Sequence, residues 1–312
     1  MDLHAPLALA ARHGRLVLIL GLVAGVALPG FALAMRPWIG EMVAGLLFLA
    51  ALRVGPRQAV GALRDVGASV GLAALFQIGL PLAAIAFFAA LGWTGAALAT
   101  FFVLMLAAPP VSGSPQFTVM CGNDPAPALR QLVVGTALLP LTVIPVFWLT
   151  PAFGDPRSVF GAAGGLMLLI AIAAGLAFLL RSTWLRHPSE AAMRSIDGLS
   201  AVAMAVVVVG LMSAVGPALR ETPLRFFAIL LLVCAVNFAL QIAAASIARI
   251  AGYGDRAAAT GIVAGNRNIA LFLTVLPQQV VDPILLYIGC YQIPMYLTPA
   301  ALGWFYRRRP HA

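Results

Sequence analysis

Long runs of apolar residues, separated by short polar segments that carry most of the arginines, extend along the whole chain. About 20 consecutive apolar residues are needed to cross a bilayer as a helix, and ten runs approach or exceed that length. The pattern therefore predicts an all-α integral membrane protein with ten transmembrane helices. The predicted spans are 16–35, 38–53, 67–90, 93–120, 129–151, 158–180, 196–215, 224–247, 257–277 and 283–306.

Two of these spans are interrupted at corresponding places. The fourth contains Pro109-Pro110-Val111-Ser112-Gly113-Ser114-Pro115, and the ninth contains Gly265-Asn266-Arg267-Asn268. Ten spans divide into two halves of five, about 16–151 and 158–306, and an odd number per half makes the second half enter the membrane inverted. Paired Gly/Pro breaks in inverted halves point to a transporter site near the bilayer midplane. We therefore expect discontinuous helices 4 and 9 to cross in a single transporter domain over residues 1–312.

A second recurrence concerns small residues. Gly21 and Gly25 lie four apart in the first span, and Gly161 and Gly165 lie four apart in the sixth. Small residues at this spacing let helices pack closely, so we interpret both pairs as packing sites.

The composition agrees with membrane insertion and excludes other classes. The 312 residues are 62% hydrophobic and 9% charged, and all nineteen basic residues are arginine. A net charge of +9 would suit nucleic acid, but these arginines fall in loops between apolar runs, as the positive-inside rule predicts. Fourteen lie on one side and four on the other, so we expect a multi-pass protein of the plasma (inner) membrane with both termini in the cytoplasm. An alternative interpretation makes residues 1–34 a signal peptide, which would leave nine helices.

Arg267 is the remaining arginine, and it stands in the middle of an uncharged run from Ala257 to Pro277. A charge at that depth normally faces a partner, a cavity or a transport path. Its planar fork suits a carboxylate, sulfonate or phosphate. No acidic residue lies in a predicted span beside either break, which favours an organic anion. The predicted substrate-binding residues are Arg267, Asn266, Asn268, Ser112, Ser114 and Gln116.

Structural alternatives stay open for several of these residues. Glu41 in the second span, or carbonyl groups at helix C-termini, would equally neutralise Arg267. Gln77, Asn237 and Gln241 would serve as well to bond across helices, and Tyr291 and Gln292 either line a cavity or support packing.

The pattern resembles the sodium/bile acid symporter superfamily over essentially the whole chain. Gln77-Ile78-Gly79-Leu80-Pro81-Leu82 is similar to that family's helix 3 motif, Pro109–Thr118 to its helix 4 segment, and Ile262–Leu271 to its helix 9 segment, with Gly265, Asn268 and Leu271 in register. The resemblance implies two sodium sites beside the crossing, with Gln77, Ser114, Thr136 and Asn268 as remnants.

The implied sodium ligands are incomplete in this chain. The family's acidic helix 9 ligand falls on Val263, its Gln falls on Arg267, and its helix 4 Asn falls on Pro115. We therefore expect a secondary transporter of organic anions, working by alternating access, with weak or absent sodium coupling and no metal or other cofactor. The alternatives are a sodium- or proton-coupled symporter that uses other ligands, and a non-transporting membrane sensor. No motif of an intramembrane enzyme is present, so no enzymatic activity is expected, and the expected partners are a small organic anion and the lipid bilayer.

Overall fold

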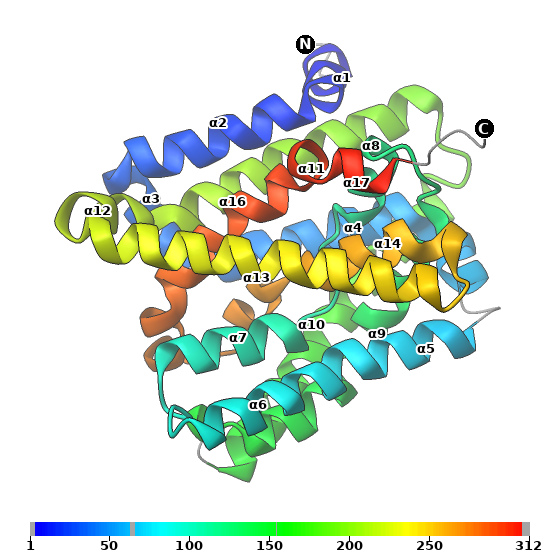
Figure 1. The fold of residues 1–312 in the computed structure, drawn as a ribbon. Coiled ribbons are helices and arrows are strands. Elements are labelled where there is room, and N and C mark those ends of the chain that lie inside the picture. The colour runs from blue at the N-terminus through cyan, green and yellow to red at the C-terminus, as the bar shows by residue number, and fades with distance from the viewer. Residues whose placement is uncertain (1–3, 63–65, 154, 308–312) are drawn as a thin grey trace. The chain divides into compact units, whose positions relative to one another are not determined.

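The computed structural model describes residues 4–62, 66–153 and 155–307, and these residues are overwhelmingly helical. Three of the arginines counted in the sequence analysis, Arg64, Arg308 and Arg309, lie outside this description. No β-strand is found among the described residues, where one isolated bridge pairs Pro110 with Arg267. Figure 1 shows the course of the chain.

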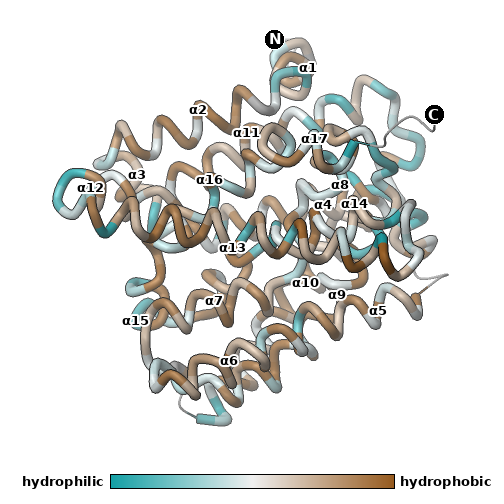
Figure 2. The backbone as a smooth tube through the Cα atoms, viewed as in Figure 1, coloured by the Kyte–Doolittle hydropathy of each residue, from teal (hydrophilic) through white to brown (hydrophobic). Residues whose placement is uncertain are grey.

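Seven helices in the described part of the chain are long and apolar enough to cross a membrane, and this makes the chain a multi-pass membrane protein. A bent pair, Ala5–Arg12 with Leu16–Ala27, would add an eighth if it counts as one span. Hydrophobic residues run along the helices, while hydrophilic ones gather at helix ends and connections (Figure 2). The seven helices are Pro29–Ala62, Val66–Ala90, Ala126–Leu149, Pro156–Thr183, Glu190–Glu221, Pro223–Ile250 and Gln278–Ala301.

The chain separates into two compact units, and neither coincides with a predicted half. Unit 1 comprises residues 1–61, 165–227 and 270–289, and unit 2 comprises residues 62–164, 228–269 and 290–312. Each unit takes segments from both halves of the sequence. No single cut in the chain therefore separates the two units.

In unit 1, α1 (His4–Arg12) and α2 (Gly14–Ala27) pack against α11 (Glu190–Leu211). Glycines permit this close approach: a Cβ on Gly21 would lie 2.7 Å from the carbonyl oxygen of Ala205, and one on Gly25 would clash with Met212. The packing interpretation is confirmed for Gly21 and Gly25. A Cβ on Gly165 would lie 3.0 Å from Val275, so the packing interpretation is confirmed for Gly165 as well. Gly161 has nothing within 4 Å among the described residues, so the interpretation is not confirmed for Gly161.

The first two predicted spans can both be located in the structure. The first is divided at Leu28 into α2 and α3 (Pro29–Met35). The second corresponds to the first part of α4 (Ile39–Ala62), which is kinked at Gly55, close to the predicted end at 53. Inside α4, Gly55 has φ 71°, a conformation that glycine adopts without penalty, directly before Pro56. Ion pairs join Arg53 to Asp197 and Arg36 to Asp282 within this unit.

The remaining helices of unit 1 continue from these two. A 3-10 turn, η1 (Arg36–Trp38), leads into α4, and another, η4 (Met212–Ala214), joins α11 to α12 (Val215–Glu221). Most of α10 (Pro156–Thr183) also belongs here. The N-terminal part of α10 belongs to unit 2, and there the Asp155 carboxylate accepts the Ser158 N–H at 3.0 Å, a bond that lowers the pKa of Asp155. Short segments complete unit 1: most of η5 (Ile269–Thr274), α15 (Gln278–Val281) and η6 (Asp282–Ile284).

Unit 2 contains both breaks, at residues 109–115 and 265–268. The third predicted span of the chain, 67–90, lies in this unit. It comprises α5 (Val66–Ala74), a π-helical turn η2 (Leu75–Gly79) and α6 (Leu80–Ala90). In Figure 1, α6 lies beside α7 (Ala97–Ala107), and α5 lies beside α9 (Ala126–Leu149), as their contacts confirm. The other elements of the unit are α8 (Ser114–Met120), η3 (Pro151–Phe153), most of α13 (Pro223–Ile250), α14 (Gly254–Gly265), most of α16 (Leu285–Ala301) and α17 (Gly303–Tyr306).

Candidate functional site

The candidate site is the place where the two broken segments of unit 2 pair with each other. Helix α7 ends at Ala107 and α8 begins at Ser114, while α14 ends at Gly265 and leaves Asn266–Asn268 extended. The Val111 N–H donates to the Asn266 carbonyl at 3.0 Å, and the Asn268 N–H donates to the Pro109 carbonyl at 2.8 Å. Each break thereby satisfies backbone groups of the other, as an apolar surrounding requires.

The position of the first break follows from its prolines. In a continuous helix, residues 109 and 110 would donate to the carbonyls of Met105 and Leu106, but proline has no N–H. The carbonyl oxygens at the end of α7 therefore lack their helical donors. One of them, that of Leu106, accepts a hydrogen bond from the Arg267 side chain at 2.9 Å.

The Arg267 guanidinium lies between the C-terminal ends of two half-helices. It is 1% exposed, and it also donates to the Val263 carbonyl in the last turn of α14 at 3.3 Å. The centroid of the Phe76 ring lies 5.2 Å from the Cζ atom of Arg267. A helix C-terminus carries partial negative charge, so the guanidinium places a positive charge where two such ends meet. This arrangement agrees with the alternative in which carbonyl groups at helix C-termini neutralise Arg267. The other residue considered for that role, Glu41, is exposed in the first turn of α4, which belongs to unit 1.

Tyr291 on α16 explains why the Val263 carbonyl is free to accept the guanidinium. In a continuous helix the Arg267 N–H would donate to Val263, but here it donates to the Tyr291 hydroxyl at 2.8 Å. The same hydroxyl donates to the Gly265 carbonyl. Tyr291 thus connects both sides of the break in α14.

A buried polar network continues from Gly265 into α13 and α16. Asn237 donates to the Gly265 carbonyl at 2.6 Å, and Gln241 donates to Asn237 at 2.7 Å and to Thr298 at 2.9 Å. Thr298 lies 3.2 Å from the Asn266 side-chain oxygen. The expectation that Asn237 and Gln241 bond across helices is confirmed.

Close helix packing makes this network possible. A Cβ on Gly261 would lie 2.6 Å from the Gln241 carbonyl oxygen, and one on Gly265 would lie 2.6 Å from that of Asn237. These two glycines lie four residues apart on α14, a small-residue spacing that is visible in the sequence but was not among the predicted packing sites.

Gln77 connects the π-helical turn to α9 beside the other break. Its side chain donates to the Gly135 carbonyl at 3.1 Å and accepts the Thr142 hydroxyl at 2.8 Å. A Cβ on Gly135 would lie 2.7 Å from the Gln77 amide nitrogen and 3.0 Å from Pro110. The prediction that Gln77 bonds across helices is confirmed. Nothing in the sequence pattern pointed to its partners, Gly135 and Thr142.

The predicted site residues differ in exposure. Asn266, Arg267, Ser114 and Gln77 are buried; Asn268, Ser112 and Thr136 are partly buried; Gln116 is exposed. The structure therefore brings Arg267 and Asn266 together at the break and leaves Gln116 outside the buried group.

Three buried polar atoms near the breaks have no hydrogen-bond partner among the described residues. They are the Ser114 hydroxyl, the Asn266 side-chain nitrogen and the Arg267 Nε. Two of the three are N–H donors, and a hydroxyl can also donate. Buried polar groups are normally paired, so this part of the molecule favours an oxygen-bearing acceptor.

The donor set does not fit a metal ion. Among the described residues no three His, Cys, Asp or Glu side chains are grouped as metal ligands. Val263 has no side-chain oxygen, and the Leu106 and Val263 carbonyls already accept the guanidinium. Hard cations need several oxygen ligands, and these two oxygens point at a positive charge instead.

The sequence matches no protein-family model, and it matches no curated protein sequence. The fold and the site define the class at a coarse level: a multi-pass membrane protein with two interrupted segments paired around a buried arginine.

Proposed function

We propose that this protein is a secondary transporter of small organic anions that works by alternating access. The observation that carries the proposal is the buried Arg267 guanidinium at the pairing of two interrupted segments. Interrupted helices with polar groups at membrane depth are typical of transporter sites, since irregular backbone there is tolerated only where protein or a cavity surrounds it.

The proposed architecture has ten spans in two inverted halves, as in the sodium/bile acid symporter superfamily. Each of the ten predicted spans overlaps described helical segments, and the fourth and ninth are the two that are interrupted at the site. The helices beside the two breaks are short: α7 has 11 residues and α14 has 12. Each is too short to cross a bilayer alone, as expected for spans that are interrupted near their middle. These correspondences support the five-plus-five arrangement.

The substrate class follows from the charge and the donors. Arg267 contributes a fixed positive charge, and the unpartnered groups of Asn266 and Ser114 contribute neutral donors. Ser112 and Asn268, which are partly buried, border the same breaks. A carboxylate, sulfonate or phosphate matches this set better than a cation or a neutral solute.

The proposed coupling does not require sodium. The resemblance implies sodium ligands at Val263 and Arg267, and the contacts of these residues do not fit a cation. In the proposal the guanidinium takes the electrostatic place of such an ion at the helix ends.

Alternating access requires bodies that move as wholes. The division of the chain into two separately packed units, each containing segments of both halves, supports such a mechanism. The arginine distribution supports an inner-membrane location with cytoplasmic termini.

The test is uptake into proteoliposomes containing the purified full-length protein. A panel of radiolabelled carboxylates, sulfonates and organic phosphates is supplied with sodium, potassium or choline as the external cation, at pH 6 and pH 8. We expect saturable uptake of at least one anion that persists in choline. A steep sodium requirement would instead establish the sodium-coupled alternative, a strong dependence on the pH gradient would establish proton coupling, and no uptake of any anion would contradict transport.

A further inference from the structure

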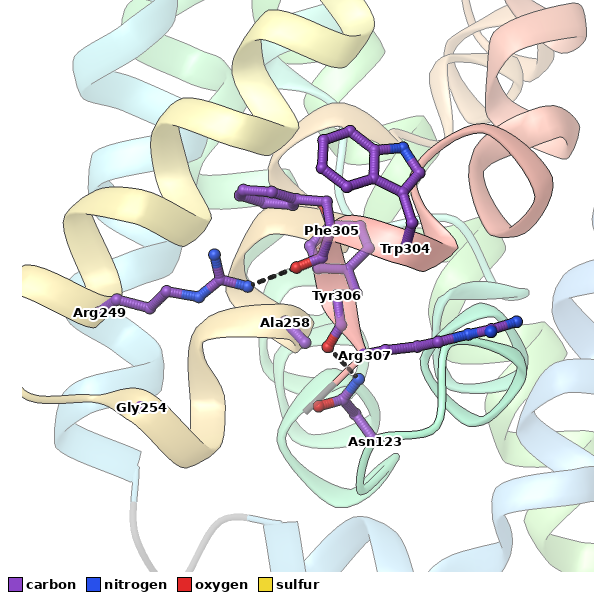
Figure 3. Close-up of a pocket in the computed structure, with 8 residues that line it drawn as sticks. All are labelled: Asn123, Arg249, Gly254, Ala258, Trp304, Phe305, Tyr306 and Arg307. Carbon is purple, nitrogen blue, oxygen red and sulfur yellow. Dashed lines mark hydrogen bonds between the residues drawn. The ribbon is translucent and has the colours of Figure 1, made fainter. Parts of the chain in front are cut away.

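A second site lies at the ends of α13 and α17, apart from the broken segments. It is a pocket of about 480 Å³ within unit 2 (Figure 3). Its lining residues are Asn123, Arg249, Gly254, Ala258, Trp304, Phe305, Tyr306 and Arg307. None of them takes part in the transport proposal above.

Arg249 is held in a defined orientation beside this pocket. One of its Nη atoms donates to the Phe305 carbonyl at 2.9 Å, and its Cζ lies 4.3 Å from the centroid of the Phe305 ring. A guanidinium has five N–H groups, so the fork retains donors for an oxyanion. Arg307 adds a second positive charge to the same lining.

Hydrogen bonds hold two of the lining residues, Asn123 and Tyr306, in place. The Asn123 side chain donates to the Tyr306 carbonyl at 3.0 Å and to the Cys121 carbonyl at 2.9 Å. The Tyr306 hydroxyl donates to Gln241 at 3.1 Å. The neighbouring Asp124 carboxylate accepts the Ala126 N–H at 3.0 Å, so it is engaged at the start of α9.

The surroundings of the pocket have the character of a membrane boundary. Trp304 is 73% exposed, and Ile250, at the end of the apolar helix α13, is 87% exposed. Exposed tryptophan beside arginine is typical of the level of lipid headgroups. The arginine asymmetry assigns this end of α13 to the cytoplasmic side, where anionic lipids attract basic groups.

We propose that this pocket binds the phosphate group of an anionic membrane phospholipid. The Arg249 fork and the Arg307 charge bind the phosphate, and the lipid tails lie along the exposed apolar surface near Ile250 and Trp304. Soluble phosphate compounds share the phosphate chemistry, but they would not use this apolar surface. The site requires only membrane insertion and is independent of transport.

The experiment measures how phosphatidylglycerol raises the thermal unfolding temperature of the full-length protein in detergent, with phosphatidylcholine as the lipid control. The variants are Arg249→Gln, Arg307→Gln and the double variant. Arg225→Gln is the matched control, because Arg225 is an exposed arginine near the opposite end of α13. We expect the apparent affinity for phosphatidylglycerol to fall about fivefold per arginine and about 25-fold in the double variant, with no change in Arg225→Gln.

Arg249→Lys keeps the charge without the planar fork and should lose less than Arg249→Gln, so it tests the site even where a glutamine variant fails to fold. Equal effects of the two lipids, an unaffected double variant, or an equal loss in Arg225→Gln would overturn the proposal. So would glycerol phosphate or inorganic phosphate binding as tightly as the lipid, because the pocket would then be a site for a soluble anion.

Discussion

The Arg267 side chain donates to the carbonyl oxygen of Leu106, a residue 161 positions earlier in the chain, at 2.9 Å. Leu106 is the residue whose helical donor would be the N–H of residue 110, and that residue is proline. The guanidinium therefore replaces a backbone donor that the sequence itself has removed.

The same chemistry occurs in unit 1. The Arg181 Nε donates to the Leu52 carbonyl at 3.1 Å, and the residue four positions after Leu52 is Pro56. Arg181 also donates to the Leu185 carbonyl at 2.8 Å. In each unit, an arginine thus donates to a carbonyl whose helical donor would have been the missing N–H of a proline. Arg267 is buried, whereas Arg181 is partly exposed.

Arg267→Ala should destabilise the protein and abolish anion binding. It leaves the Leu106 and Val263 carbonyls without their donor, at a cost of about 1–3 kcal/mol for each buried group. Arg267→Lys should recover part of the loss, because one ammonium keeps the charge but cannot reproduce the fork. Thermal unfolding and anion binding of the purified variants measure both effects, with Arg225→Ala as the exposed control. Normal binding and stability in Arg267→Ala would show that the arginine is dispensable.

Tyr291→Phe should weaken the pairing of the two breaks. The change removes only the hydroxyl, and it leaves the Arg267 N–H and the Gly265 carbonyl each without that partner. We expect a loss of about 1–3 kcal/mol in the free energy of unfolding. Tyr253→Phe removes the same atom from an exposed tyrosine and should have no measurable effect. Equal unfolding temperatures for the two variants would argue against a bridging role for Tyr291.

Gly265→Ala should be severely destabilising, whereas Gly161→Ala should not. A methyl group on Gly265 would lie 2.6 Å from the Asn237 carbonyl oxygen and closer still to Gln241, while Gly161 has nothing described within 4 Å. In a helix, alanine is favoured over glycine by roughly 0.5–1 kcal/mol, so Gly161→Ala should be neutral or stabilising. Yield of monodisperse protein and its unfolding temperature compare the two. A well-folded Gly265→Ala protein would contradict the close approach of α14 to α13.

The double variant Val263→Glu with Arg267→Gln should make stability depend on sodium. It removes the internal cation and places a carboxylate where Val263 packs among Phe76, Ala128 and Ala259. A bound ion would add about 1.4–2.7 kcal/mol at sodium concentrations 10 to 100 times its Kd. Unfolding is measured in sodium chloride and in choline chloride, and the wild type should not distinguish the two salts. No sodium effect in the double variant would weaken the view that the guanidinium takes an ion's place.

Cysteine labelling should place Pro188 and the C-terminus on the cytoplasmic side and Thr222 on the other. Single cysteines at these three positions are introduced after Cys121, Cys234 and Cys290 have been replaced. A membrane-impermeant maleimide added to intact cells should label only the cysteine at 222. Labelling of Pro188→Cys but not of the C-terminal cysteine would remove the five-plus-five arrangement.

Local chemistry made much of the fold predictable from the sequence. The apolar run 67–90 corresponds to helical segments at 66–90, and the run 224–247 to α13 at 223–250. The two breaks were located because Pro109 and Pro110 remove N–H groups and because Gly265-Asn266 is a poor helix sequence. The division at Leu28 was missed, since it does not disturb the apolar pattern enough to be recognised. The predicted end of the second span at 53, by contrast, lies close to the kink at Gly55.

Only the tertiary structure decided which groups the breaks bind. The sequence by itself determined that the chain is apolar enough for a membrane, that two segments are interrupted and that Arg267 stands inside one of them. A proline shows which carbonyl loses its donor, but the replacement donor is whichever group lies nearby in space. That Arg267 binds Leu106, that Tyr291 connects Gly265 to Arg267, and that both units combine segments of both halves depend on packing between residues far apart in sequence, which no local pattern encodes.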